Sequence, residues 1–133
     1  MQISFVRSGG FAGALRTVRG TVNLKNDQPE ITADAAYHRA LAPDETQQLR
    51  AGADPAELCR AVEQIQKRTA RSADLDHYHI TVEAENGQKC DVDLNTSGSS
   101  NELEGVPPAV ASFIRWVREE SRKIQAHRAA AGR

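Results

Sequence analysis

The sequence lacks any long apolar run. None of its 133 residues lies in a stretch that approaches the ~20 consecutive apolar residues of a membrane-spanning helix. The opening residues, MQISFVRSGG, also lack the basic leader and apolar segment of a secretory signal. We therefore expect a cytoplasmic protein that has no membrane partner.

Cysteine is equally scarce, with Cys59 and Cys90 as the only two in the chain. Small secreted domains use many cysteines for disulfides, whereas cytosolic proteins keep their thiols reduced. Because no export signal is visible, we expect two reduced, partly buried thiols and no disulfide.

The chain also has no excess of positive charge. Its formal net charge is −1, which gives no overall basic footprint, so we expect no nucleic-acid partner. Charge is nevertheless unevenly spread. Between Asp74 and Glu104 there are eight acidic residues and one basic residue, whereas the segment from Arg115 onward has six basic and two acidic residues. Solvated surfaces account for both runs.

The common motifs of nucleotide binding and catalysis are missing. The glycine-rich stretch RSGGFAG (7–13) matches neither G-x-x-x-x-G-K-[ST] nor G-x-G-x-x-G, and a predicted strand, not a helix, follows it. The serines of SGSS (97–100) have no G-x-S-x-G elbow, and Cys59 has no acid–base partner that the sequence reveals. We therefore expect a protein that is not an enzyme, with no catalytic residues and no cofactor.

Alternating apolar residues predict strands in the first part of the chain. The pattern indicates one strand over Gln2–Arg7 and another over Thr17–Leu24, in which Gly20 is a candidate bulge. A weaker alternation predicts a further strand over Ile31–Tyr37.

Capping residues predict three helices. One begins near Pro43, and a clearer one begins with Asp54 as N-cap and Pro55 at the first helical position. A last helix opens at Pro107 or Pro108. It carries an apolar stripe at i, i+3, i+4 and i+7, formed by Val110, Phe113, Ile114 and Val117. We interpret Trp116, next to this stripe, as a residue at the rim of the core, with a binding anchor as the alternative.

The strongest local pattern predicts a β-hairpin. Apolar residues alternate over Tyr78–Ala84 and again over Cys90–Leu94. A two-residue loop would mix the apolar and polar faces, whereas the three-residue loop Glu85–Gly87 pairs Val82 with Cys90 and keeps both apolar sets on one face. We therefore predict the three-residue loop.

This register brings together the weak candidate for a metal site. His77 and His79 lie on the polar face of the first hairpin strand, and Asp93 is expected opposite His79. Zn²⁺ binds three or four N, O or S ligands, so these side chains could hold it. No H-E-x-x-H or C-x-x-C motif supports this interpretation, and cross-strand His–Asp pairing on a solvated face is the simpler one.

The predicted elements add up to an α+β fold. We expect an antiparallel sheet of about four or five strands with two to three helices packed on one face. Residues 1–124 should form a single domain, and residues 125–133 a frayed polar C-terminal tail because the stretch beyond Lys123 is rich in Ala and Arg.

The glycine-rich stretch after the first strand is the remaining candidate for recognition. Glycines let a backbone approach a partner closely, and Phe11 on such a loop could anchor in a partner's pocket. Phe11 could equally fold back and cover the end of the sheet. Composition favours neither alternative.

Three segments together resemble the emfourin family, which are small bacterial protein inhibitors of protealysin-like, thermolysin-type zinc metallopeptidases. The segments are ISFVRSGGFAG (3–13), YHITVEAENGQ (78–88) and VPPAVASFIRWV (106–117), in the family's order. The chain departs from the family in extra residues around Lys25–Ala40 and in a long polar loop after Leu94.

The resemblance implies a bacterial, cytoplasmic inhibitor that blocks the active-site cleft of such a peptidase with a protein surface. Because these enzymes cleave before large apolar residues, their cleft holds an apolar pocket that Phe11 could fill. The motif match implies a protease-binding loop of Ser8, Gly9, Gly10, Phe11, Ala12 and Gly13. The zinc belongs to the enzyme, so no cofactor is implied, and we expect a monomer when free. The alternative is a small metal-binding or interaction module without inhibitor activity.

Overall fold

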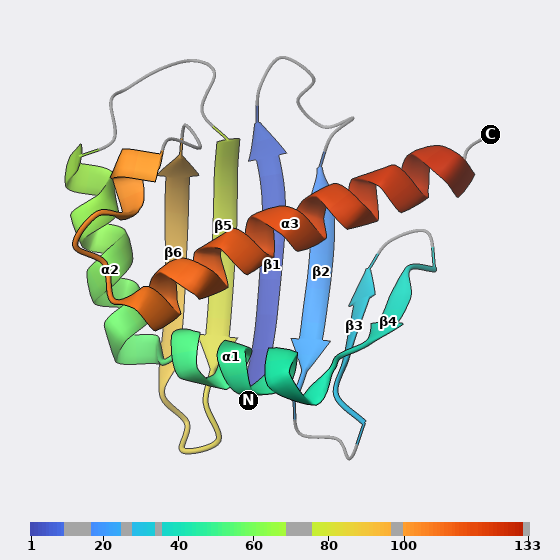
Figure 1. Cartoon of the computed structure of the whole chain (residues 1–133), viewed down its shortest axis with the longest axis horizontal. Coiled ribbons are helices and arrows are strands. Elements are labelled where there is room, and N and C mark those ends of the chain that lie inside the picture. The colour runs from blue at the N-terminus through green and yellow to red at the C-terminus, as the bar shows by residue number, and fades with distance from the viewer. Residues whose placement is uncertain (10–16, 25–27, 34–35, 69–75, 97–99, 132–133) are drawn as a thin grey trace.

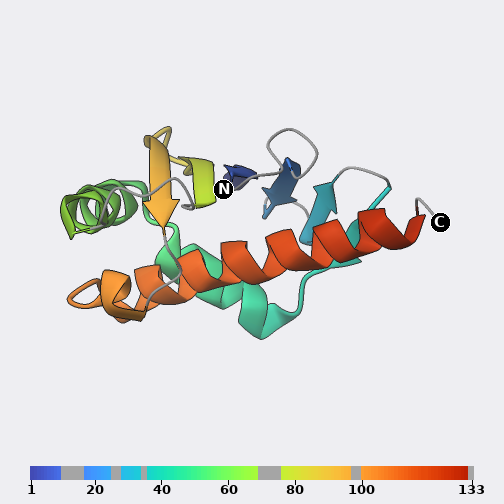
Figure 2. The same cartoon turned by 90° about the horizontal axis from the view of Figure 1, so that it is seen from above.

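A computed structural model describes residues 1–9, 17–24, 28–33, 36–68, 76–96 and 100–131. Their strands form one antiparallel sheet of six in the order β4-β3-β2-β1-β5-β6, and α3 crosses one face of it (Figure 1). Figure 2 shows α1 and α3 on that same side, with α2 beside β6. The elements are β1 (Gln2–Gly9), β2 (Val18–Asn23), β3 (Glu30–Ala33), β4 (His38–Ala40), α1 (Pro43–Gly52), α2 (Pro55–Arg68), β5 (Asp76–Glu83), β6 (Lys89–Thr96), a short 3₁₀ helix η2 (Ser100–Leu103) and α3 (Pro108–Ala131).

The predicted α+β class is therefore confirmed, with more strands than the four or five expected. The additional strand arises because residues 31–37 do not form one strand. The chain reverses there: Ala36 has φ 61°, and the Ala33 N–H donates to the Tyr37 carbonyl over 2.9 Å. A positive φ is uncommon for a residue with a Cβ, so nothing in the alternation indicated this turn. The result is the β3–β4 ribbon at one edge of the sheet.

The core lies between the sheet and the helices. Apolar side chains of the central strands, such as Ile3, Phe5 and Ile80, are fully buried against the apolar stripe of α3. Gly20 is not the predicted bulge, because it pairs in register with Phe5 of β1 and Ala33 of β3. A Cβ on Gly20 would lie 2.5 Å from the Phe5 ring. The ring therefore occupies the space that a side chain at this position would need.

The hairpin register follows the prediction. Val82 lies opposite Cys90 and His79 opposite Asp93. Gly87 has φ 89°, the left-handed conformation that the three-residue loop requires, and the Ala84 N–H donates to the Gln88 carbonyl over 2.8 Å. The apolar alternation predicted this register correctly because both strands and their loop are close together in sequence.

The prediction of reduced thiols was wrong. Cys59 of α2 and Cys90 of β6 form a disulfide, with their Cα atoms 5.9 Å apart and a sequence separation of 31. Docking of α2 against β6 places the two residues within the Cα separation that a disulfide spans. Sequence reasoning had correctly placed Cys90 on the core face, but it had no information on where α2 packs.

The predicted end of the last helix also needs correction. α3 runs to Ala131, well beyond Lys123, and side chains of the expected frayed tail bond to β1 and to the residue before β2. Arg7 of β1 donates to Gln125 over 2.9 Å, and Arg128 donates to the carbonyl of Thr17. These tertiary bonds hold the last turns in place. Within the described part of the chain, no helix is long and apolar enough to cross a lipid bilayer.

Candidate functional site

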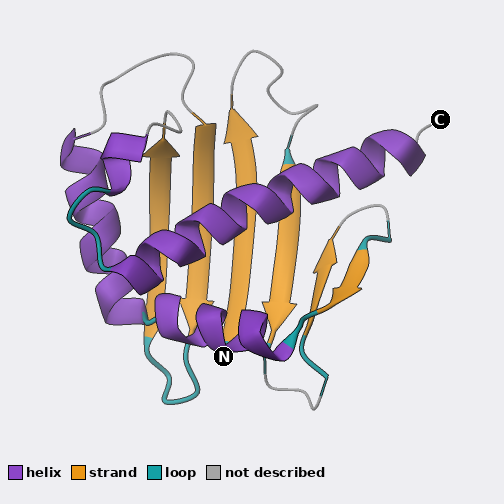
Figure 3. Cartoon of the chain, in the orientation of Figure 1, coloured by secondary structure: helices purple, strands orange, loops and turns teal. Residues whose placement is uncertain are grey.

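The glycine-rich segment connects β1 and β2 at one end of the sheet. Arg7 is the last β1 residue to pair with β2, whereas Ser8 and Gly9 continue alone along β5, opposite His77 and Asp76. β6 ends at the same end of the sheet, because Asp76 pairs with Thr96. Figure 3 shows these strand ends together, opposite the end near α1. We call this the loop end of the sheet.

Only the first two residues of the predicted protease-binding loop belong to a described element. Ser8 and Gly9 are the final residues of β1. Gly10, Phe11, Ala12 and Gly13 lie outside the described residues. Both interpretations of Phe11, as an anchor or as a cover for the sheet end, therefore stay predictions.

The base of this connection is tied to other elements on both sides. On the β1 side, Arg7 donates to both carboxylate oxygens of Asp76 at 3.3 Å and to Gln125 of α3 at 2.9 Å. On the β2 side, the carbonyl of Thr17 accepts from Arg128 of α3. The side chain of Arg7 is 18% exposed, so water competes little for its bonds. Both ends of the connection are therefore fixed relative to α3.

A second set of bonds fixes the end of β6 next to the loop end. The Thr96 hydroxyl donates to Glu102 of η2 and accepts from Arg118 of α3. Arg118 also pairs with Glu102 at 3.7 Å, and both side chains are largely buried. These groups attach η2 and β6 to α3, so the strand end beside the connection is also well supported.

The weak metal candidate forms a hydrogen-bonded ladder on the open face, by which we mean the face of the sheet away from α1 and α3. His79 contacts Asp93 through Nδ1 at 2.7 Å and Asp91 through Nε2 at 2.6 Å. His77 contacts Asp93 at 3.1 Å and Asn95 at 2.8 Å. The sequence therefore placed His77, His79 and Asp93 together correctly.

The chemistry of this ladder is that of a charged histidine held by two carboxylates. Carboxylates only accept, so both ring nitrogens of His79 must donate. The hydrogen bond that His79 donates to Asp93 is the main reason that the pKa of His79 is raised, and the same bond lowers the pKa of Asp93. A ring with both nitrogens protonated offers no lone pair to a metal. Among the described residues, no group of three His, Cys, Asp or Glu is placed to hold a metal ion.

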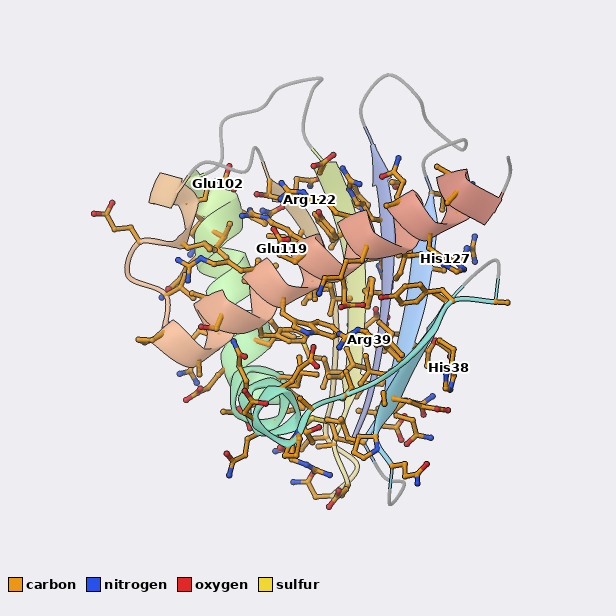
Figure 4. The ribbon with its side chains drawn as sticks, turned by 45° about the vertical axis from the view of Figure 1, so that its right-hand side comes forward. His38, Arg39, Glu102, Glu119, Arg122 and His127 are labelled. Atoms are coloured by element: carbon orange, nitrogen blue, oxygen red, sulfur yellow. A yellow bond between two sulfur atoms is a disulfide. The ribbon has the colours of Figure 1, made fainter. Side chains whose placement is uncertain are left out.

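A partly buried polar cluster that sequence reasoning missed lies between the β3–β4 ribbon and the helices. Arg39 of β4, labelled in Figure 4, donates to both oxygens of Glu45 in α1, at 2.9 and 2.7 Å. Arg39 also donates to Glu120 of α3. Tyr37 donates to Glu120 at 3.0 Å, and Trp116 donates to Glu45 at 2.6 Å. We call these five residues the Arg39 cluster.

Electrostatics inside the Arg39 cluster favour the charged forms of the ion pairs. Hydrogen bonds from Arg39 lower the pKa of Glu45 to about 2 against the opposing effect of burial. The bonds that Arg39 donates to Glu45 raise the pKa of Arg39, and burial raises the pKa of Tyr37. Only 1% of the Glu120 side chain is exposed. The cluster therefore joins the β3–β4 ribbon to α1 and α3.

One sequence signal could have revealed this cluster. Glu120 lies between Val117 and Ile124 on the stripe of α3 that faces the core, and both of those neighbours are buried. An acidic residue on an apolar stripe predicts a buried charge that needs a cationic partner. Trp116 is half-buried, with its ring edge-on to Phe5 at 6.1 Å, in agreement with its interpretation as a rim residue.

Comparisons of the chain with protein-family models, with curated proteins and with solved structures found no match.

Proposed function

We propose that this protein is a bacterial inhibitor of a thermolysin-like, protealysin-type zinc metallopeptidase, and that the connection between β1 and β2 blocks the enzyme's active-site cleft. The observation that carries the proposal is the anchored base of this connection. A loop that enters a peptidase cleft must resist cleavage. The bonds of Arg7 on one side and Arg128 on the other restrict the two ends of the β1–β2 connection. Restricting a loop before it binds also reduces the entropy lost on association.

The arrangement of the three segments that resemble the emfourin family gives further support. β1 contains most of the first segment, β5 most of the second, and these strands are neighbours in the sheet. α3 contains most of the third, and its Trp116 packs edge-on against Phe5 of β1. Segments that lie far apart in the chain therefore form one packed unit that ends at the proposed contact loop.

One of the two departures from the family pattern lies away from this unit. The extra residues around Lys25–Ala40 include β3 and β4, which form the edge of the sheet farthest from β6. The Arg39 cluster fastens β4 to the helices. An addition at this edge leaves the β1–β5 pair and the loop end unchanged.

In this proposal the protein contributes no catalytic residue and no cofactor, and it acts as a monomer that forms a one-to-one complex. The test is titration of a constant concentration of thermolysin and of a protealysin-like peptidase with the purified protein. We expect reversible loss of peptide cleavage with a one-to-one end point, and no effect on a serine peptidase. Unchanged cleavage by both metallopeptidases at large inhibitor excess would reject inhibition and leave the interaction module as the alternative.

The proposed location in the cytoplasm has a separate test because the Cys59–Cys90 disulfide weighs against it. Disulfides persist in oxidising compartments and are rare in the cytosol. Alkylation of the protein inside cells, followed by mass spectrometry, counts the free thiols. Two alkylated cysteines support the cytoplasm, whereas none indicates an oxidising compartment.

A further inference from the structure

The Cys59–Cys90 disulfide is the covalent link between α2 and the edge strand β6, which run side by side (Figures 1 and 2). Cys90 is 1% exposed and belongs to the core, whereas Cys59 is only partly buried and packs at the margin of the core. The two ends of the disulfide therefore differ in their access to solvent, and Cys59 is the accessible end.

Two hollows in the surface lead to Cys59, which lines both of them. The larger hollow, of about 760 Å³, lies between α2 and β6, and its lining carries charges of both signs. The smaller hollow, of about 200 Å³, is lined by Pro55, Ala56, Cys59, Gln88 and Lys89. Lys89 is the one charged side chain among these lining residues. Because the thiolate is the form of a thiol that attacks a disulfide, this lysine favours the approach of a small thiol to Cys59.

Non-covalent contacts also hold α2 against the sheet. Leu58, Val62 and Ile65 of α2 are buried in the core. Towards the end of the helix, the Gln66 side chain accepts from the Asn95 N–H and donates to the Asn95 carbonyl, both at 3.0 Å. An intact disulfide prevents α2 from separating from β6. Without it, only these non-covalent contacts oppose a local opening of the helix.

Gln66 also connects α2 to the loop end of the sheet. Its side-chain oxygen accepts from the Asn95 side-chain amide at 3.1 Å. The side-chain oxygen of Asn95 in turn lies 2.8 Å from Nδ1 of His77. His77 pairs with Ser8 of β1, the first residue of the proposed protease-binding loop. A continuous line of contacts therefore joins α2 to the base of that loop.

We propose that the Cys59–Cys90 disulfide is a reversible redox switch that controls how firmly α2 supports the loop end. In the oxidised form α2 is fixed on β6, and Gln66 holds Asn95 and through it His77. In the reduced form α2 opens locally more often, and this support weakens. The effect on Asn95 does not depend on what the protein binds, whereas a consequence for peptidase inhibition rests on the proposed function.

The switch operates by thiol–disulfide exchange with a dithiol, such as a protein that carries a C-x-x-C pair. One thiolate of the dithiol attacks Sγ of Cys59, the Cys59–Cys90 bond breaks, and Cys90 leaves with the electron pair as a thiolate. The second thiolate then attacks the dithiol's own sulfur in the mixed disulfide and releases Cys59. Two electrons and two protons pass to the protein, which gains two thiols, while the dithiol becomes a disulfide. Oxidised glutathione reverses the reaction.

The first experiment uses the folded full chain, oxidised or treated with dithiothreitol without denaturant. Alkylation and mass spectrometry count the thiols, and we expect both cysteines to be alkylated after treatment. NMR hydrogen exchange of the Asn95 amide, which bonds to Gln66, should accelerate by about tenfold or more on reduction and slow again after oxidised glutathione. The Ala33 amide in the β3–β4 ribbon, at the other edge of the sheet, is the internal control and should be unchanged.

Two variants separate the switch from a general loss of stability. Gln66→Ala removes the contact with Asn95, so the Asn95 amide should already exchange rapidly in the oxidised form and should not respond to reduction. Gln64→Ala, at an exposed position of the same helix, is the matched control and should respond like the parent protein.

The inhibition assay uses the double variant Cys59→Ser with Cys90→Ser in place of a reductant, because added thiols would bind the zinc of the peptidase. We expect this variant and oxidised Gln66→Ala to inhibit about tenfold more weakly than the oxidised parent, since a less ordered loop base loses more entropy on binding.

Several results would overturn the switch. They are a disulfide that resists dithiothreitol until the protein unfolds, an Asn95 amide that exchanges equally in both forms, or equal acceleration of the Asn95 and Ala33 amides. Equal inhibition by the double variant and the oxidised parent would reject the connection to the loop end. If the oxidised parent inhibits neither metallopeptidase, the proposed function fails, and the Asn95 exchange still supports or rejects the switch.

Discussion

Gly20 lies under the ring of Phe5 in the centre of the sheet, where any side chain would collide with that ring. We predict that Gly20→Val destabilises the protein by roughly 1–3 kcal/mol, the usual cost of overpacking a core. Arg19→Val, at the exposed neighbouring position of the same strand, is the matched control and should change stability little. Urea unfolding measures both variants. Equal stabilities would show that the Phe5 ring moves aside without cost.

Glu45 gives the protein a specific sensitivity to acid. Its pKa is lowered from 4.5 to about 2 in the folded state, so folding disfavours its protonation. The stabilisation is complete above about pH 4.5 and is lost as the pH falls towards 2. Across this window the parent protein should lose up to about 1.4 kcal/mol per pH unit more than Glu45→Gln.

The measurement for Glu45 is the free energy of unfolding in urea at several pH values between 2 and 6. Glu63→Gln, on the exposed side of α2, is the control and should keep the parent's acid dependence. If the free energy of unfolding had the same pH dependence in the parent protein and in Glu45→Gln, the Arg39–Glu45 bonds would contribute nothing to stability.

At the scale of elements, the β3–β4 ribbon depends on Arg39 for its attachment. We predict that Arg39→Ala loosens the ribbon and accelerates exchange of the Ala33 and Leu41 amides, which bond to Tyr37 and Pro29, on the order of tenfold. Gln48→Ala, at an exposed position of α1, is the control. Hydrogen exchange followed by NMR measures both, and equal rates in the two variants would contradict the anchoring role.

The disulfide connects α2 to β6 and should contribute to global stability. Closing a loop of 31 residues is worth roughly 3–4 kcal/mol in the chain-entropy model. A reductant should therefore lower the free energy of unfolding by about this amount. The double variant Cys59→Ser with Cys90→Ser should not respond to reductant. An unchanged urea midpoint in the parent protein after verified reduction would contradict this prediction.

The elements also show what the sequence could and could not predict. The β5–β6 register was predictable because the apolar alternation and Gly87 are close together in sequence. The start of α2 was predictable from its N-cap residue Asp54, whose side chain accepts from the Glu57 N–H at 3.1 Å. The disulfide and the Arg39 cluster depend on how helices dock against the sheet. Residues that meet only through such packing leave little trace in one sequence.

At the scale of the whole molecule, the proposed protease-binding connection lies at one end of the sheet. It leaves the loop end from the central strand β1. α3 supports the connection through Gln125 and Arg128. Sequence reasoning identified this candidate surface from its glycines.

The central claim is that Phe11 anchors the connection in the cleft of a thermolysin-like peptidase, and the most direct test is the inhibition constant of Phe11→Ala beside its unfolding free energy. We expect about 30-fold or weaker inhibition, equivalent to about 2 kcal/mol, with stability nearly unchanged. Gln88→Ala, at the opposite end of the sheet, should inhibit like the parent protein. A Phe11→Ala protein that inhibits fully, or that loses roughly 3–5 kcal/mol of stability as a core residue would, contradicts the account.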